Sequence, residues 1–279
     1  MHHSLHISIV QSSIVWENPP QAIRELEVLL LSELREETDL IIFCEMFTTG
    51  FTMNTTGMGE PMDGPCIQWM KTIAANRNCA VCGSLIISEN HHYYNRFVFV
   101  HPDGRIEIYD KAHLFNLANE GQFYTAGKSR TLIDYRSWKI MPFICYDLRF
   151  PVWLRNTEEA ELMILVAQFP ERRRLAFTSL LPARAIENVC FVAGVNALGR
   201  DGNDMIYSGD SMFGIMKVTV WASTLTINQV SGRLHCPKKN YMPLEKHTLF
   251  SATAINLFWN HKPKYHILAF YLIYKMLPI

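Results

Sequence analysis

The stretch KIMPFICYDLRFPVW, residues 139–153, contains the pattern that decides the fold, because a short apolar run ends abruptly at reactive polar side chains. Two more stretches repeat it, LIIFCEMFTTGF at residues 40–51 and RIEIYDKAHLF at residues 105–115. Short apolar runs are typical of buried strands, and α/β folds place their sites where such strands end. The three stretches therefore predict an α/β fold with polar residues gathered at strand ends.

Strand-like runs alternate with helical patterns through the first 212 residues, as in an α/β chain. The predicted strands cover residues 5–10, 40–44, 80–88, 96–100, 105–109, 139–146, 162–168 and 190–198. The run LIIF at residues 40–43 suits a strand covered on both faces, whereas residues 96–110 alternate as an antiparallel hairpin with a turn at HPDG. This mixture predicts mixed sheets packed against each other, with helices outside.

Two long helices are predicted between the strands. The first begins at Pro19 and Pro20 and carries an apolar face formed by Ile23, Leu26, Leu29, Leu30 and Leu34. The second follows Pro170, with a spine formed by Ala176, Leu180, Ala183 and Ile186. Pro182 lies inside this second helix, so a kink or a break is expected there.

The composition indicates a globular protein, because 49% hydrophobic and 19% charged residues exclude a disordered or low-complexity chain. The 26 basic and 26 acidic side chains of the 279 residues cancel, which argues against nucleic acid as a partner. The charge is unevenly distributed, however. Residues 1–212 carry 18 basic and 25 acidic side chains and residues 213–279 carry 8 and 1, so the net charge changes from −7 to +7.

Seven cysteines in a sequence that begins without a secretory leader predict free thiols in a reducing, cytoplasmic environment. Cys79 and Cys82 form a CxxC pair, but no second ligand pair for zinc accompanies them, so two packing thiols are the better interpretation. The apolar run at residues 265–279 is too short for a membrane span. These features, with the balanced charge, predict no metal site and neither a nucleic-acid nor a membrane partner.

Glu45, Lys111 and Cys145 together suggest covalent catalysis. Singly, each has a plain structural explanation, because a Glu after a buried strand is usually a hydrogen-bond acceptor and a lone Cys in an apolar run usually packs. A cysteine nucleophile, however, needs a base to take its proton and a fixed cation to stabilise the developing oxyanion. The three residues supply one of each.

These segments resemble the carbon-nitrogen hydrolase (nitrilase) superfamily, whose Glu-Lys-Cys triad sits in such contexts. EMFTTGF, DKAHLF, ICYDLRFPVW, LLPARAIEN and DGNDMIYSGDS are most similar to the omega-amidase branch, which hydrolyses the side-chain amide of 2-oxo acid amides. The resemblance covers residues 5–212 in order and spacing. It implies a four-layer α-β-β-α sandwich with its hydrolase domain at residues 4–212, assembled as a homodimer.

The resemblance also implies a mechanism that needs no cofactor. Glu45 would take the thiol proton of Cys145 and return it to the leaving ammonia, while Lys111 and the backbone N–H of Tyr146 would bind the oxyanion. Glu120 would support the lysine. Water would then hydrolyse the thioester on Cys145, again with Glu45 as base.

Five further residues are predicted to contact the substrate, namely Phe47, His113, Arg149, Phe169 and Arg173. An arginine suits the free carboxylate of a short 2-oxo dicarboxylic acid monoamide such as 2-oxoglutaramate. The structural alternatives are an ion pair of Arg149 with Asp147 or Glu187, a solvated arginine run at residues 172–174, and a His113 that only binds a backbone carbonyl.

Three positions depart from the family pattern. Cys44 stands where the family usually has proline, and Gln168 and Phe169 replace its usual Asn and Trp, so substrate preference has room to differ. After residue 212 no match is recognisable. Together with the change in charge, this predicts an atypical C-terminal segment at residues 213–279, either a replaced or frame-shifted terminus or a divergent completion of the same domain.

Two alternatives to an omega-amidase-like enzyme stay open. One is another carbon-nitrogen hydrolase that acts on an N-carbamoyl compound or an aliphatic amide, since the triad would be identical. The other is an inactive variant whose basic C-terminal segment binds acidic partners.

Overall fold

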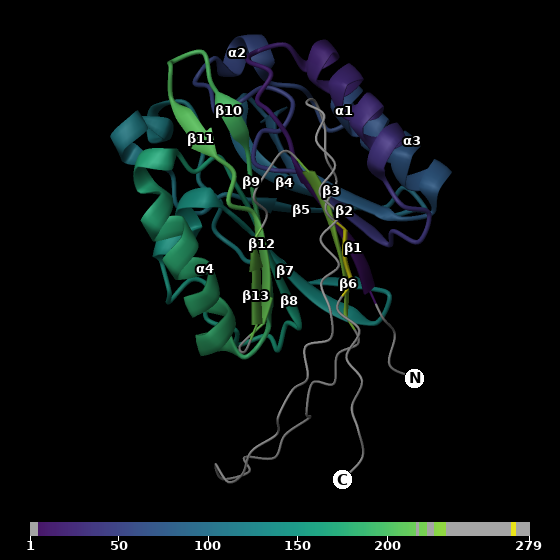
Figure 1. The fold of residues 1–279 in the computed structure, drawn as a ribbon. Helices are drawn as coiled ribbons and strands as arrows, with labels where there is room; N and C mark the ends of the chain where they lie inside the picture. Colours follow the sequence, from purple (N-terminus) through teal and green to yellow (C-terminus); the bar gives the residue numbers. More distant parts are fainter. Residues whose placement is uncertain (1–4, 216–217, 222–225, 233–268, 272–279) are drawn as a thin grey trace, which may run out of the picture.

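Two β-sheets pack face to face between layers of helices (Figure 1). The computed structural model describes residues 5–215, 218–221, 226–232 and 269–271. The first sheet contains β1 (Leu5–Gln11), β2 (Leu40–Ile42), β3 (Ala80–Glu89), β4 (His92–Val100), β5 (Ile106–Asp110), β14 (Thr226–Gly232) and β15 (Ala269–Tyr271), in the order β15-β14-β1-β2-β3-β4-β5. Both faces of its central strands are buried, which explains the uninterrupted apolar runs.

The second sheet contains the strand that ends directly before Cys145. It contains β6 (Ile133–Tyr135), β7 (Trp138–Ile144), β8 (Leu162–Ala167), β9 (Phe191–Asn196), β12 (Met212–Ile215) and β13 (Val218–Trp221), in the order β13-β12-β9-β8-β7-β6. A separate two-stranded hairpin, β10 (Leu198–Arg200) and β11 (Ile206–Ser208), lies beyond it. The β4–β5 hairpin turns at the predicted HPDG.

Helices cover the outer face of each sheet and complete the predicted four layers. The helices α1 (Pro19–Glu33) and α3 (Pro65–Arg77) lie on the first sheet, near the short α2 (Thr55–Met58), and α4 (Arg174–Asn188) lies on the second (Figure 1). Helix α1 starts at the predicted prolines, and the Asn18 side chain caps it by accepting from the N–H of Gln21 at 3.2 Å. Its predicted apolar face is confirmed by the burial of Leu26, Leu29 and Leu30.

The face predicted for α4 is partly right, because Ala176 and Leu180 pack against the core, but the centre of the buried face is shifted by one residue. The buried residues are Phe177, Leu181, Arg184, Ala185 and Asn188, whereas the predicted spine residue Ile186 is 53% exposed. The reason is the sheet surface: Gly194 on β9 leaves space that the Leu181 side chain occupies, and Phe177 packs on Phe169 with ring centroids 5.3 Å apart. The helix continues through Pro182 without an interruption.

Residues beyond 212 contribute strands to both sheets. The strand β14 pairs with β1 along its full length, from Leu5 opposite Gly232 to Gln11 opposite Thr226, and β12 pairs with β9. The rest of the predicted atypical segment at residues 213–279 lies outside the described residues. No helix in the described ranges has the length and apolarity to cross a membrane.

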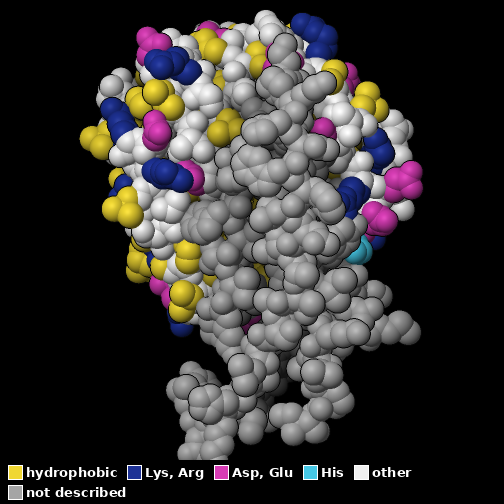
Figure 2. All heavy atoms as spheres, in the orientation of Figure 1, with side chains coloured by type: hydrophobic (Ala, Val, Ile, Leu, Met, Phe, Trp, Pro, Cys, Tyr) yellow, Lys and Arg dark blue, Asp and Glu magenta, His cyan; other side chains and the backbone are white. Residues whose placement is uncertain are grey.

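The CxxC cysteines are packing residues, and the described surface carries charges of both signs. Cys79 and Cys82 are fully buried, which confirms the packing interpretation of the CxxC pair, and burial raises the pKa of the Cys79 thiol to about 12. On the face shown in Figure 2, Lys and Arg side chains are interspersed with Asp and Glu over the described surface.

The contact between α4 and the second sheet yields a test of the packing. A Cβ on Gly194 would lie 2.4 Å from Leu181 Cδ1, so Gly194→Ala forces the buried Leu181 side chain out of its present position. We expect a loss of about 1–3 kcal/mol in the free energy of unfolding, measured by urea denaturation. Ser179→Ala on the exposed side of α4 serves as the control and should change little. A Gly194→Ala protein with the same free energy of unfolding as the parent would contradict the packing described.

Candidate active site

The chemically reactive residues converge from both sheets. Glu45 follows β2, Lys111 directly follows β5, and Cys145 directly follows β7. Lys111 Nζ lies 2.9 Å from Glu45 Oε1, and it also donates to both carboxylate oxygens of Glu120 at 2.9 and 3.0 Å. The structure thus brings together the four charged or nucleophilic residues that the sequence analysis singled out.

These charges are removed from water. Glu45, Lys111 and Glu120 are each at most 1% exposed. Burial alone would lower the pKa of the Lys111 ammonium, but the carboxylates of Glu120 and Glu45 outweigh it and raise that pKa. Burial raises the pKa of Glu120, and Lys111 acts against this. The lysine is therefore a permanent cation shared by two carboxylates.

The nucleophile candidate sits in a strained turn at the wall of a cavity. Cys145 has a φ of +45° and opens a short 3₁₀ turn, Cys145–Arg149. Burial holds the pKa of its thiol well above the ordinary value, the Glu45 charge raises it further, and Lys111 lowers it in part. The thiol is protonated at rest, so it needs a base, and Glu45 is the carboxylate whose charge acts most strongly on it.

A buried network that the sequence analysis missed supports Glu45. Asn95 Nδ2 donates to Glu45 Oε1 at 2.7 Å, and Asn95 Oδ1 accepts from Ser84 Oγ at 2.8 Å. The Gln168 N–H donates to Glu45 Oε2 at 2.7 Å. The available signal was weak: Ser84 interrupts the apolar part of β3, and Asn95 stands next to Arg96 on β4.

Asp147 links the lysine segment to the cysteine turn. Its carboxylate accepts from Tyr109 Oη at 2.6 Å, from the backbone N–H of His113 at 3.0 Å and from that of Ile144 at 3.0 Å. His113, which the sequence predicts to contact the substrate, is not among the residues that line the cavity: its ring stacks on Phe150 at 3.7 Å, and its Nδ1 lies 2.8 Å from Asp147 Oδ1. His113 thus holds the fold together.

Phe47 also lies outside the cavity, contrary to prediction. It is buried and stacks on Phe43 with ring centroids 4.6 Å apart, next to Trp69. The chain reverses between Met46 and Gly50, and this turn directs Phe47 into the first sheet's core. Phe51, four residues later, lines the cavity instead.

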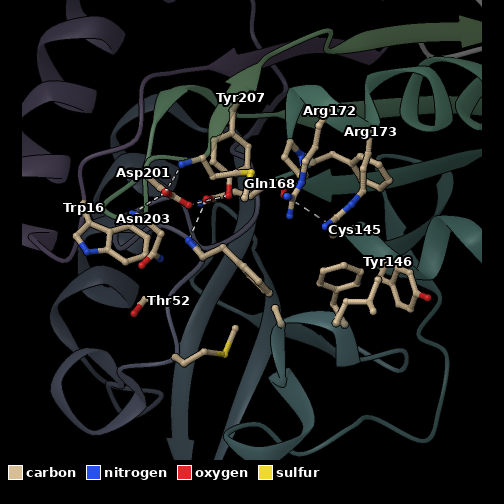
Figure 3. A pocket seen from close by; sticks show the side chains of 18 of the residues that line it. Trp16, Thr52, Cys145, Tyr146, Gln168, Arg172, Arg173, Asp201, Asn203 and Tyr207 are labelled. Carbon is tan, nitrogen blue, oxygen red and sulfur yellow. Dashed lines mark hydrogen bonds between the residues drawn. The ribbon is translucent and has the colours of Figure 1, made fainter.

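The cavity beside Cys145 has a volume of about 760 Å³ and two chemically different sides (Figure 3). Trp16, Thr52 and Asn203 line one side, while Tyr146, Arg172 and Arg173 lie on the other side, near Cys145. Arg149 and Phe169 line it as predicted.

Three arginines on this wall have no carboxylate partner within the described part of the chain, namely Arg149, Arg172 and Arg173. The two carboxylates that might have paired with Arg149 are occupied elsewhere: Asp147 by Tyr109 and His113, and Glu187 by Arg184. Arg174 differs from its neighbours because it pairs with Asp210. The guanidinium of Arg173 lies 4.4 Å from the Phe115 ring centre.

Comparisons with known proteins agree with this arrangement. The carbon-nitrogen hydrolase family model matches residues 6–224. The chain is 41% identical over 207 residues to the omega-amidase YafV of Escherichia coli (strain K12), a match that covers 74% of this chain and 80% of the relative. The chain belongs to the carbon-nitrogen hydrolase family.

Other relatives support the same assignment of this carbon-nitrogen hydrolase. A 2-oxoglutaramate amidase of Bacillus subtilis (strain 168) is 33% identical over 211 residues, covering 74% of this chain and 81% of the relative. The crystal structure of XC1258 from Xanthomonas campestris, a superfamily member with an arsenic adduct in its active site, matches with a TM-score of 0.78 at 38% identity, covering 82% of this chain and 90% of that one.

This carbon-nitrogen hydrolase is a mixed α/β sandwich that acts on amide C–N bonds and is similar to omega-amidases. The family match runs past the predicted domain boundary at residue 212, since it extends to residue 224. Within the described residues, no cluster of His, Cys, Asp and Glu has an arrangement that could hold a metal ion.

The shared lysine yields a pH-dependent test. Lys111→Met leaves two buried carboxylates without a counter-charge, and we expect a loss of about 3–5 kcal/mol in the free energy of unfolding at pH 7. Uncompensated carboxylates have raised pKa values in the folded state, so the deficit is full at high pH and shrinks as the pH falls and both groups protonate. Urea denaturation between pH 5 and 8 measures it.

The double variant Lys111→Met/Glu120→Gln is the control for this charge effect. It removes one of the two uncompensated carboxylates and should recover part of the lost free energy of unfolding at pH 7. A deficit that is independent of pH, or that does not respond to Glu120→Gln, would contradict the ion cluster as the cause.

Proposed function

We propose that this hydrolase is an omega-amidase-type enzyme, which releases ammonia from a short dicarboxylic acid monoamide of the 2-oxoglutaramate type. The observation that carries the proposal is the group of unpaired arginines on the cavity wall beside Cys145. An uncharged amide would leave Arg149, Arg172 and Arg173 without a counter-charge, whereas a substrate with a free carboxylate supplies one. The similarity to a 2-oxoglutaramate amidase points to the same class.

The first half of the reaction forms a thioester. Glu45 takes the proton of the Cys145 thiol, and the thiolate attacks the amide carbon. The carbonyl oxygen becomes an oxyanion next to the Lys111 ammonium and the backbone N–H of Tyr146, where each donor contributes about 3–4 kcal/mol in other hydrolases. Glu45 then returns the proton to the nitrogen, the C–N bond breaks, and ammonia leaves.

The second half restores the enzyme. Glu45 accepts a proton from water, which attacks the thioester carbon, and the oxyanion forms again at the same donors. Collapse of this intermediate breaks the C–S bond, and the Cys145 sulfur regains its proton. Lys111 cannot serve as the base, because its raised pKa keeps it protonated.

Ammonia release from 2-oxoglutaramate is the direct test of the proposed function. We expect release by the parent protein and none above background by Cys145→Ala, since no other group can form the acyl-enzyme. Succinamate and an N-carbamoyl amino acid on the same panel distinguish the other members of the family. Size-exclusion chromatography of the same sample tests the predicted homodimer. Turnover by Cys145→Ala, or turnover of only the N-carbamoyl compound, would overturn the proposal.

The carboxylate site yields a separate prediction. Arg173→Met should lower kcat/KM for 2-oxoglutaramate by about 10- to 100-fold, because a charge-assisted hydrogen bond contributes about 1.5–3 kcal/mol. Turnover of butyramide, which lacks the carboxylate, should change much less. Arg105→Met on the exposed β4–β5 turn is the matched control. Equal losses on both amides would show that Arg173 does not bind the carboxylate.

A further inference from the structure

The turn that presents Glu45 is strained. Met46, the next residue, has a φ of +41°, in the left-handed region that a non-glycine residue adopts only when its surroundings hold it there. Its side chain is fully buried, and its N–H donates to Ser84 Oγ at 2.9 Å. Relaxation at Met46 would change the backbone that directly follows Glu45, so the position of the Glu45 side chain depends on what holds this turn.

The Gln168 side chain holds this turn from the other sheet. Gln168 directly follows β8 and is 4% exposed. Its Nε2 donates to the carbonyl oxygens on both sides of the strained position, to Glu45 O at 2.8 Å and to Met46 O at 3.3 Å. Its Oε1 accepts from the N–H of Phe51 at 2.9 Å, where the turn ends.

The backbone of Gln168 touches both reacting residues. Its N–H donates to Glu45 Oε2 at 2.7 Å, and its carbonyl oxygen lies 4.0 Å from Cys145 Sγ as the acceptor of a weak thiol hydrogen bond. One residue thus contacts the carboxylate of the base, the backbone of its turn and the nucleophile. Figure 3 shows Gln168 between the Cys145 side of the cavity and the opposite wall.

We propose that Gln168 is a positioning residue, which fixes the Glu45 carboxylate against the Cys145 thiol by bracing the strained turn at Met46. This inference uses the proposed function only for the roles of Glu45 and Cys145. Glu45 transfers a proton to or from three partners in one cycle, the thiol, the leaving nitrogen and water, so a small displacement weakens every step. Misplacement of a reacting group by about 1 Å can cost about 100-fold in rate.

A glutamine amide suits this position chemically. It offers two N–H donors to the two carbonyl oxygens and one acceptor to the Phe51 N–H. Glutamate would keep the acceptor but would direct an anionic oxygen at two carbonyl oxygens. Leucine would leave the Glu45 carbonyl oxygen and the Phe51 N–H unpaired, whereas the Met46 carbonyl oxygen would still accept from the N–H groups of Thr49 and Gly50. Asparagine keeps the amide but is one methylene shorter, so it cannot reach both ends of the turn at these distances.

Three variants of Gln168 test the proposal with 2-oxoglutaramate as substrate. For Gln168→Leu we expect kcat to fall about 10- to 100-fold with a smaller change in KM, and for Gln168→Asn a smaller loss of kcat. Gln168→Glu places a second carboxylate near Glu45, and a like charge raises the pKa of a carboxyl group. The acid limb of its kcat/KM profile should therefore move to higher pH, which loss of packing alone would not cause.

A second readout does not depend on the substrate. The alkylation rate of Cys145 by iodoacetamide at neutral pH, followed by mass spectrometry of its peptide, reports how readily Glu45 takes the thiol proton. It should fall in Gln168→Leu in parallel with kcat. If no amide is turned over, the proposed function fails while this measurement still tests the positioning role.

Asn188→Leu is the matched control, because Asn188 is also a buried amide, binds the N–H of Asn156 at 2.9 Å and lies outside the cavity lining. The Asn188→Leu variant should have a lower free energy of unfolding than the parent. Its kcat, pH profile and alkylation rate should stay close to those of the parent. The proposal is overturned if Gln168→Leu retains the parent alkylation rate, or if both variants lose activity only in proportion to the fraction unfolded.

Discussion

The ammonium group of Lys111 between two buried carboxylates is the interaction on which the site depends. Its two partners, Glu45 and Glu120, are excluded from water, so the lysine supplies the counter-charge that offsets the cost of burying them. The same cation sits beside the Cys145 thiol. One cation thus neutralises two buried carboxylates and lies next to the thiol of the proposed nucleophile.

Placement of this cluster between two sheets imposes a second constraint. Glu45 and Lys111 come from the first sheet and Cys145 from the second, so their distances depend on how the sheets pack. Two strained turns, at Met46 and at Cys145, aim the side chains. Hydrogen bonds across the interface hold them, from Gln168 to Glu45 and from Tyr109 to Asp147. The apolar packing of the two sheets holds the backbone in place, and the hydrogen bonds orient the side chains of the site.

Prediction from sequence succeeded where a local pattern reports a local environment. The apolar runs around β2, β7 and β8 indicated buried strands, and the polar residues at their ends indicated the site, because strand ends meet at one edge of a sheet. It failed where a side chain's direction depends on contacts distant in sequence. Phe47 enters the core and His113 binds Asp147, although both lie within two residues of a reactive group.

The sequence by itself determined the fold class and the family and singled out Glu45, Lys111 and Cys145, since strand periodicity and short motifs are local properties of the chain. Only the tertiary structure decided which arginines are free to bind an anion and which amide braces Glu45. Arg173 and Arg174 are adjacent in sequence, yet Asp210 pairs with one and leaves the other on the cavity wall. Gln168 reaches Glu45 across 123 positions of the chain, a contact that exists only once the two sheets have packed.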